Sequence, residues 1–267
     1  MKNRASREKF RRMTNESQTR ALREAQFWDR FYQTASLSGS DPGDERLSPE
    51  LEAFHARVLA DPARRVLSIG GGVDGLGVQI ASRGAEVLSI DVSPIAVEKT
   101  AALSVHHACG SNLTARVARC EELGFENEFD LVISKGVLHH LDFSPGLLAV
   151  HRALKPGGRL IATEPFGFSP WIRAIQSRFP YHPTPHSFTT EDEFKLSPVE
   201  IDEIRQIFRE IEITHFEFLA RQSVSYLLNR SGLGAVTRLL DRADAFLMPR
   251  FAWARHFSEH GIIRAVK

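Results

Sequence analysis

A strand–glycine loop–helix–strand unit between residues 65 and 91 constrains this chain more than any other feature. Residues 66–69 form a short apolar run, three glycines follow at 70–72, an apolar helical stretch covers 76–83, and a second strand covers 86–91. The alternation continues with a helix at 94–106, strands at 115–118 and 129–134, a helix at 145–154, a turn at 155–158 and a strand at 159–163. Such alternation favours a doubly wound α/β fold with a mostly parallel sheet.

Helices are expected before this region. Residues 16–33 carry apolar side chains at three- and four-residue spacing, which is typical of a helix face. Ser48-Pro49 then begins a second helix, which should end near Asp61-Pro62. We therefore expect an N-terminal arm and helical cap over 1–62 and the main domain over 63–267.

After Glu164 the alternation pauses for about thirty residues that contain five prolines, and we expect residues 165–197 to be an inserted substrate lid. The Ser197–Glu200 segment has the pattern of a capping box and begins another helix. The elements expected beyond it are a strand at 211–219, a helix at 235–246 and a closing strand at 261–266.

Composition excludes several classes of protein. The chain has 34 basic and 33 acidic residues, so its net charge gives no reason to expect a nucleic-acid or membrane partner, and its basic arm at 1–12 is most simply a solvated terminus. No apolar stretch approaches the roughly 18 residues of a membrane span. The two cysteines form neither a disulfide framework nor a zinc motif, so we expect a cytoplasmic protein.

The strand ends predict where a ligand binds, because ligands of open parallel sheets bind beyond the carboxyl ends of the strands. Asp91 ends the second strand, 21 residues after Gly70, and an acid at this place can accept hydrogen bonds from both ribose hydroxyls of an adenosine. A dinucleotide and a nucleoside such as S-adenosylmethionine both fit, since Gly70, Gly72 and Gly75 also satisfy the dinucleotide pattern.

Six motifs separate the two ligands. They are Val66–Gly72 (VLSIGGG), Leu88–Ser93 (LSIDVS), Glu121–Phe125 (EELGF), Phe129–Ser134 (FDLVIS), Gly136–Leu141 (GVLHHL) and Leu154–Gly158 (LKPGG). Their order and spacing over residues 65–164 resemble those of class I S-adenosylmethionine-dependent methyltransferases. The resemblance implies a seven-stranded sheet with an antiparallel last strand, S-adenosylmethionine as cofactor and methyl transfer as the reaction.

The resemblance also assigns cofactor-binding roles. It implies that Gly70, Gly71 and Gly72 pass under the methionine part of the cofactor, Asp91 holds the ribose, Val92 packs on adenine, Arg119 and Cys120 face the adenine edge, and Ser134 and Lys135 line the methionine end. The chain departs from the family pattern at three positions. Ser68 and Arg119 replace common acids, and Asp74 replaces a common glycine.

Three residues are candidates for catalysis. His139 and His140 follow the fourth strand, where an acceptor would approach, and a neutral imidazole can take a proton from a hydroxyl or amine. A structural or cofactor-side role for this pair is the alternative. Glu164 ends the fifth strand, where its carboxylate can orient a nucleophile or cap a backbone turn.

Aromatic side chains with polar tips suggest the acceptor pocket. Tyr181, His182 and His186 in the insertion are candidate substrate-binding residues, with Trp28 and Tyr32 closing the crevice from the N-terminal helix. We expect no metal site, because Pro183 and Pro185 remove the helix that a His182–His186 pair would need.

The sequence thus predicts a methyltransferase that acts on an oxygen or nitrogen nucleophile of a small organic molecule. A nicotinamide-dependent oxidoreductase and a non-catalytic cofactor-binding partner protein remain the alternatives. Nucleic acid is not expected as a partner, and the sequence does not predict an oligomeric state.

Overall fold

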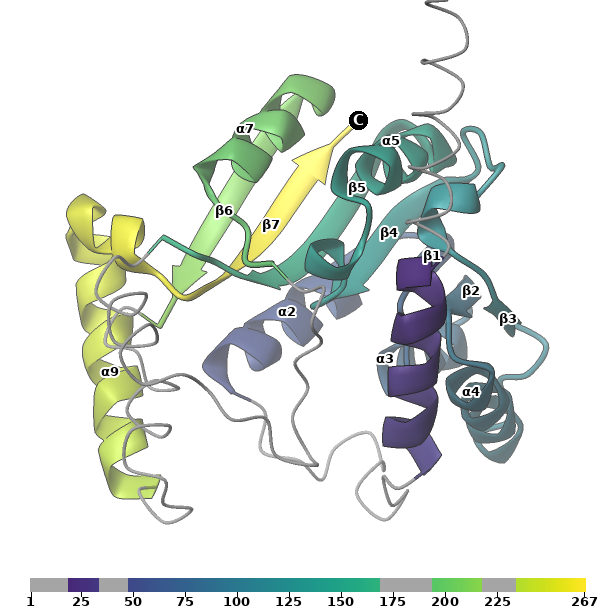
Figure 1. Cartoon of the computed structure of the whole chain (residues 1–267). Coiled ribbons are helices and arrows are strands. Elements are labelled where there is room, and N and C mark those ends of the chain that lie inside the picture. The colour runs from purple at the N-terminus through teal and green to yellow at the C-terminus, as the bar shows by residue number, and fades with distance from the viewer. Residues whose placement is uncertain (1–18, 34–47, 169–193, 218–233) are drawn as a thin grey trace, which may run out of the picture.

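The computed structural model describes residues 19–33, 48–168, 194–217 and 234–267 and contains one seven-stranded sheet (Figure 1). The strands are β1 (Arg65–Ile69), β2 (Glu86–Asp91), β3 (Leu113–Val117), β4 (Phe129–Lys135), β5 (Leu154–Pro165), β6 (Glu210–Phe216) and β7 (His260–Val266). Their order across the sheet is β3-β2-β1-β4-β5-β7-β6. Successive strands are added on one side of β1 up to β3 and on its other side from β4 onward. The boundary between β1 and β4 is therefore the switch point at which ligands of such sheets bind.

The sheet confirms the predicted fold class. Strands β1 to β5 pair in parallel, with Ile69 beside Ile90 of β2 and Ser134 of β4. Strand β7 lies between β5 and β6 and runs antiparallel to both of them. The carboxyl ends of β1, β2, β4 and β5 therefore lie along one edge of the sheet, which is where ligands of such sheets bind.

Helices cover both faces of the sheet. Alternation along β1 sends Val66 to one face and Leu67 to the other, and each joins a separate buried cluster. The cluster that contains Val66 includes side chains of α2 (Pro49–Ala60) and α3 (Gly75–Ser82), and α4 (Pro94–His106) packs beside them. The cluster that contains Leu67 includes side chains of α5 (Phe143–Ala153) and α7 (Pro198–Ile207). The division into an N-terminal arm and cap up to residue 62 and a main domain after it stays a prediction. Phe54 and Val58 of α2 are buried in the same cluster as side chains of the sheet.

Several predicted helix boundaries are confirmed by local capping. The Ser48 and Ser93 side chains accept hydrogen bonds from the Leu51 and Ala96 N–H groups, and a proline opens each helix. Ser197 and Glu200 form the predicted capping box of α7. The described part of the N-terminal helix covers 19–33.

Two expectations about the later strands and the turn before β5 were wrong. Residues 155–158 are not a turn before β5, because Leu154 already pairs with Phe129 and the strand continues through an irregularity to Arg159. Strand β6 ends at Phe216 rather than at 219, because Glu217 has a φ of +60°, which an extended strand does not allow.

The last helix is longer than expected. Helix α9 covers Gly234–Arg250 instead of 235–246, and its Pro249 lies in the last turn. A short 3-10 helix, η4 (Ala252–Phe257), connects it to β7. In Figure 1, α9 lies beyond β6, at the opposite side of the molecule from the N-terminal helix. Within the described residues, no helix has both the length and the apolar character needed to cross a membrane.

Candidate functional site

The glycine loop after β1 approaches its neighbours too closely for any side chain. Gly70 and Gly72 have φ values of +56° and +60°, which favour glycine. A Cβ at Gly70 would lie 2.5 Å from the Val137 side chain, and one at Gly71 would lie 2.4 Å from Ser89 Oγ. The Gly71 N–H donates to the Ile90 carbonyl at 3.0 Å, which ties the loop to β2. The loop therefore leaves bare backbone facing the crevice.

Asp91 is held against this loop at the end of β2. Its Oδ2 accepts from the Gly72 N–H and its Oδ1 from the Ser93 N–H, both at 2.8 Å. The side chain is buried, and burial raises its pKa against the lowering effect of these backbone bonds. Since a carboxylate offers about four lone-pair sites, it keeps capacity for a hydroxyl donor. The arrangement fits a ligand with a ribose.

Asp74, which replaces a common glycine of the resembled family, has a structural role. Its Oδ1 accepts from the Gly77 N–H at 2.7 Å, so it caps the N-terminus of α3. Its Oδ2 accepts from Ser89 Oγ at 2.7 Å, and its own N–H donates to Thr100 Oγ1. The departure therefore stabilises the glycine loop.

The N-terminal helix closes over the loop at Tyr32. A Cβ at Gly72 would lie 2.3 Å from the Tyr32 hydroxyl, so this hydroxyl lies on the loop beside Asp91. Burial, followed by the Asp91 and Asp74 carboxylates, raises the Tyr32 pKa. The Lys99 ammonium donates to the Tyr32 carbonyl, and Ser93 Oγ donates to Asp29. The structure thus places Tyr32 on the glycine loop near Asp91, and its assignment to the acceptor pocket stays a prediction.

Trp28 lies one turn earlier on the same helix and contacts both Tyr32 and His140. Its ring stacks on Tyr32 with centroids 5.9 Å apart and meets His140 edge-on at 5.8 Å. Its indole N–H donates to Glu24 at 3.0 Å, and Glu24 also lies 3.5 Å from His140 Nδ1. Trp28 and Glu24 therefore connect the N-terminal helix to the predicted catalytic histidines.

Glu164 is buried at the end of β5, where it binds the turn that carries His139. Its Oε1 accepts from the Val137 and Leu138 N–H groups at 3.1 and 2.9 Å and from Ser134 Oγ at 3.3 Å. Its Oε2 lies 2.7 Å from His139 Nδ1. The carboxylate therefore caps the 3-10 turn η3 (Leu138–His140) and also orients the His139 ring.

Arg119, which replaces a common acid of the resembled family, lies next to carboxylates. Its guanidinium lies 2.9 Å from Glu122, 3.7 Å from Glu121 and 3.8 Å from Asp142. Cys120 is buried, and burial raises the pKa of its thiol. An assignment to the adenine edge for both residues stays a prediction.

The remaining predicted residues differ in how far the structure describes them. Val92 is half-buried directly after β2, Ser134 is buried at the end of β4, and Lys135 beside it is exposed. Tyr181, His182 and His186 lie outside the described residues.

The sequence analysis missed Glu24 and Asp29. Glu24, Trp28 and Tyr32 are four residues apart, so they share one face of the N-terminal helix. That spacing was the available signal, but a polar residue on an aromatic helix face does not by itself indicate what it contacts.

Comparisons with known proteins bear on the same region. Residues 67–162 match the family model described as a methyltransferase domain. A ubiquinone/menaquinone biosynthesis C-methyltransferase from Geotalea daltonii is 31% identical over 108 residues, which cover 39% of this chain and 46% of the relative. The chain thus spans about half the length of the curated relatives it matches.

Solved structures share the fold. Geranyl diphosphate C-methyltransferase from Streptomyces coelicolor, solved with Mg²⁺, geranyl diphosphate and S-adenosylhomocysteine, superposes with a TM-score of 0.57 at 14% identity and covers 92% of this chain and 97% of that one. The [4+2]-cyclase SpnF superposes with a TM-score of 0.52 at 16% identity and covers 81% and 78%. At these identities the likeness bears on the fold alone.

Proposed function

We propose that this chain, whose residues 67–162 match a methyltransferase domain, transfers a methyl group from S-adenosylmethionine to a small organic molecule. The observation that carries the proposal is the buried Asp91 carboxylate at the end of β2, bonded to the Gly72 N–H of a loop that has no room for side chains.

The residues at the carboxyl ends of β1 and β2 fit the cofactor. Gly70 to Gly72 let the methionine part pass close to the backbone, and Asp91 accepts hydrogen bonds from the ribose hydroxyls. The Tyr32 hydroxyl lies against the Gly72 backbone of the same loop. When bound, S-adenosylmethionine supplies a methyl group on a sulfonium sulfur, which keeps the electron pair of the broken C–S bond.

His139 is the proton acceptor in this proposal. A neutral imidazole that donates its Nδ1–H to Glu164 leaves Nε2 as the basic atom. Glu164 holds the ring in this orientation, and Nε2 takes the proton that the acceptor loses as the new bond to the methyl carbon forms. Because the reaction is an in-line displacement, positioning contributes most of the rate, and His140 with Trp28 helps to shape the acceptor side.

The acceptor atom that we propose is an oxygen or nitrogen, since a histidine base suits nucleophiles that carry a proton. Carbon methylation is the second candidate, supported by the matched region of a relative named a C-methyltransferase. Tyr181, His182 and His186 stay predicted acceptor-pocket residues.

Transfer of labelled methyl groups tests the proposal. The full-length protein is incubated with methyl-¹³C-labelled S-adenosylmethionine and a metabolite extract, and the products are analysed by mass spectrometry and NMR. The ¹³C chemical shift separates O-, N- and C-methyl products. A labelled small molecule that forms more slowly with Asp91→Ala at limiting cofactor is the expected result, and a protein that binds the cofactor but labels nothing across broad extracts would favour the non-catalytic alternative.

A further inference from the structure

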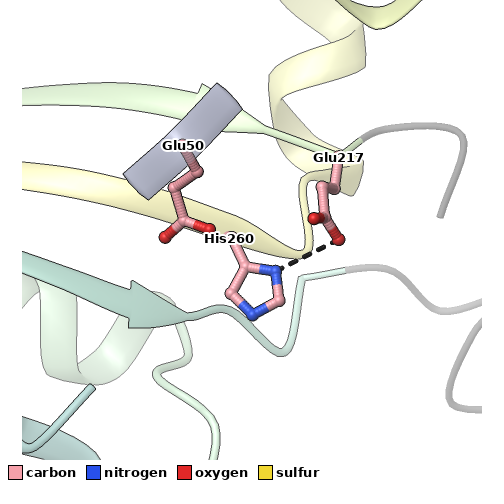
Figure 2. A group of neighbouring side chains, drawn as sticks. All are labelled: Glu50, Glu217 and His260. Atoms are coloured by element: carbon pink, nitrogen blue, oxygen red, sulfur yellow. Dashed lines mark hydrogen bonds and ion pairs between the residues drawn. The ribbon is translucent and has the colours of Figure 1, made fainter. Parts of the chain in front are cut away.

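A second group of ionisable side chains lies outside the donor site. Figure 2 shows Glu50, Glu217 and His260 turned toward one another beside the end of the sheet. Glu50 is in the first turn of α2, Glu217 directly follows β6, and His260 begins β7. Three elements that are distant in sequence thus bring two carboxylates and an imidazole together.

The spacing of the three groups is close to that of ligands around one ion. One ligand atom from each residue lies within 4.8 Å of the other two, and His260 Nδ1 is 3.3 Å from Glu217 Oε2. Two atoms bound at about 2.1 Å to the same ion are at most about 4.2 Å apart. Small side-chain adjustments therefore suffice to close the three groups around a metal.

The charges in this group favour a dication. Glu50 and Glu217 are 6% and 8% exposed, so two carboxylates are buried together. Lys195 lies 3.2 Å from a different carboxylate, that of Glu259. A protonated His260 supplies one positive charge against two negative ones, whereas a divalent ion with a neutral imidazole balances both carboxylates.

The groups are held in place by the surrounding structure. The Thr163 hydroxyl donates to Glu50, and the Glu259 N–H donates to the Phe216 and Glu217 carbonyls at 3.3 and 3.2 Å. These bonds maintain the left-handed backbone of Glu217, whose φ is +60°. The Glu217 carboxylate is therefore directed toward His260 by a fixed backbone.

We propose that Glu50, Glu217 and His260 bind a divalent metal ion of the Mn²⁺, Fe²⁺ or Zn²⁺ class, with its remaining positions open to water or to an oxygen of the acceptor. An imidazole ligand favours these ions over Mg²⁺ and Ca²⁺, which prefer oxygen alone. The site goes beyond the proposed methyl transfer, because neither Asp91 nor His139 belongs to it.

Metal titration of the full-length protein tests the site directly. After chelation and dialysis, Mn²⁺ is added and free Mn²⁺ is followed by electron paramagnetic resonance. We expect one ion per chain, and at least about a tenfold weaker affinity for Glu50→Gln and His260→Gln. The matched control is Glu259→Gln, which removes a buried carboxylate next to His260 but outside the group and should bind Mn²⁺ as the wild type does.

A measurement on the wild-type protein alone tests the site even if the variants do not fold. X-ray absorption of the Zn²⁺-loaded protein should give a first shell of nitrogen and oxygen with a single imidazole. A shell containing sulfur or several imidazoles, no Mn²⁺ or Zn²⁺ binding at millimolar metal, or unchanged affinity in the folded variants would overturn the proposal. The same samples are also titrated with S-adenosylmethionine. Normal binding of S-adenosylmethionine without metal binding would overturn the metal site alone and leave the proposed function standing.

Discussion

Glu164 Oε2 lies 2.7 Å from His139 Nδ1, and the same carboxylate accepts from the Val137 and Leu138 N–H groups of the turn that carries His139. One side chain therefore both builds the turn and orients the imidazole. Because Glu164 lies near the end of β5 and His139 lies in η3, the turn that follows β4, the sheet sets the position of the ring.

Replacing His139 by Gln tests its role as a base. We expect kcat to fall by about a hundredfold or more with nearly unchanged affinity for S-adenosylmethionine, because the proton acceptor is lost while the donor loop stays intact. His106→Gln, at an exposed position in the last turn of α4, is the matched control, and a thermal destabilisation with a modest rate change for His139→Gln would assign His139 to the scaffold.

Glu164→Gln should be costly for stability. The amide places an NH₂ group or a weaker acceptor beside the Val137 and Leu138 N–H groups, and a buried group left unsatisfied costs about 1–3 kcal/mol. Chemical denaturation measures this loss. A variant as stable as the wild type would show that the turn does not depend on the carboxylate.

Asp91→Ala should weaken S-adenosylmethionine binding by about 1.5–3 kcal/mol, the range for hydrogen bonds to a charged group. Calorimetry measures it, with Asp202→Asn on the exposed face of α7 as the control. A folded Asp91→Ala protein with wild-type affinity would remove Asp91 from the site.

Tyr32 and Trp28 should affect different ligands. Tyr32→Phe removes the hydroxyl that lies on Gly72, so it should weaken S-adenosylmethionine binding by about 0.5–1.5 kcal/mol. Trp28→Ala removes the ring that meets His140 and should mainly raise the acceptor KM. If both variants change only acceptor kinetics, the N-terminal helix covers the acceptor and not the donor.

His215 gives the protein a defined pH dependence of stability. Burial, followed by the nearby Arg255 and His256 charges, lowers its pKa to about 4, and its Nδ1 lies 2.8 Å from Ser258 Oγ. A histidine with a lowered folded pKa favours folding while neutral, so this contribution is present above about pH 6.5 and is lost as pH falls toward 4. The free energy of unfolding of His215→Gln should fall less steeply over that window, and parallel curves for the two proteins would contradict the assignment.

Local capping and periodicity predicted the elements that those signals govern. Helix α4 covers the expected residues, and its start is fixed by Ser93 and Pro94. The sequence did not predict that β5 begins at Leu154, since Gly157-Gly158 is also a common turn pattern and only the pairing with Phe129 decides between them. Likewise, neither the Tyr32–Gly72 contact nor the Glu50–Glu217–His260 group is visible in any local pattern, because tertiary packing creates both.

The most direct test of the account is a pair of calorimetric titrations of the wild-type protein, one with S-adenosylmethionine and one with NADH. We expect binding of one S-adenosylmethionine per chain and no measurable binding of NADH, because the glycine loop and Asp91 lie within the residues that match a methyltransferase domain. Tight NADH binding without S-adenosylmethionine binding would contradict it and favour an oxidoreductase.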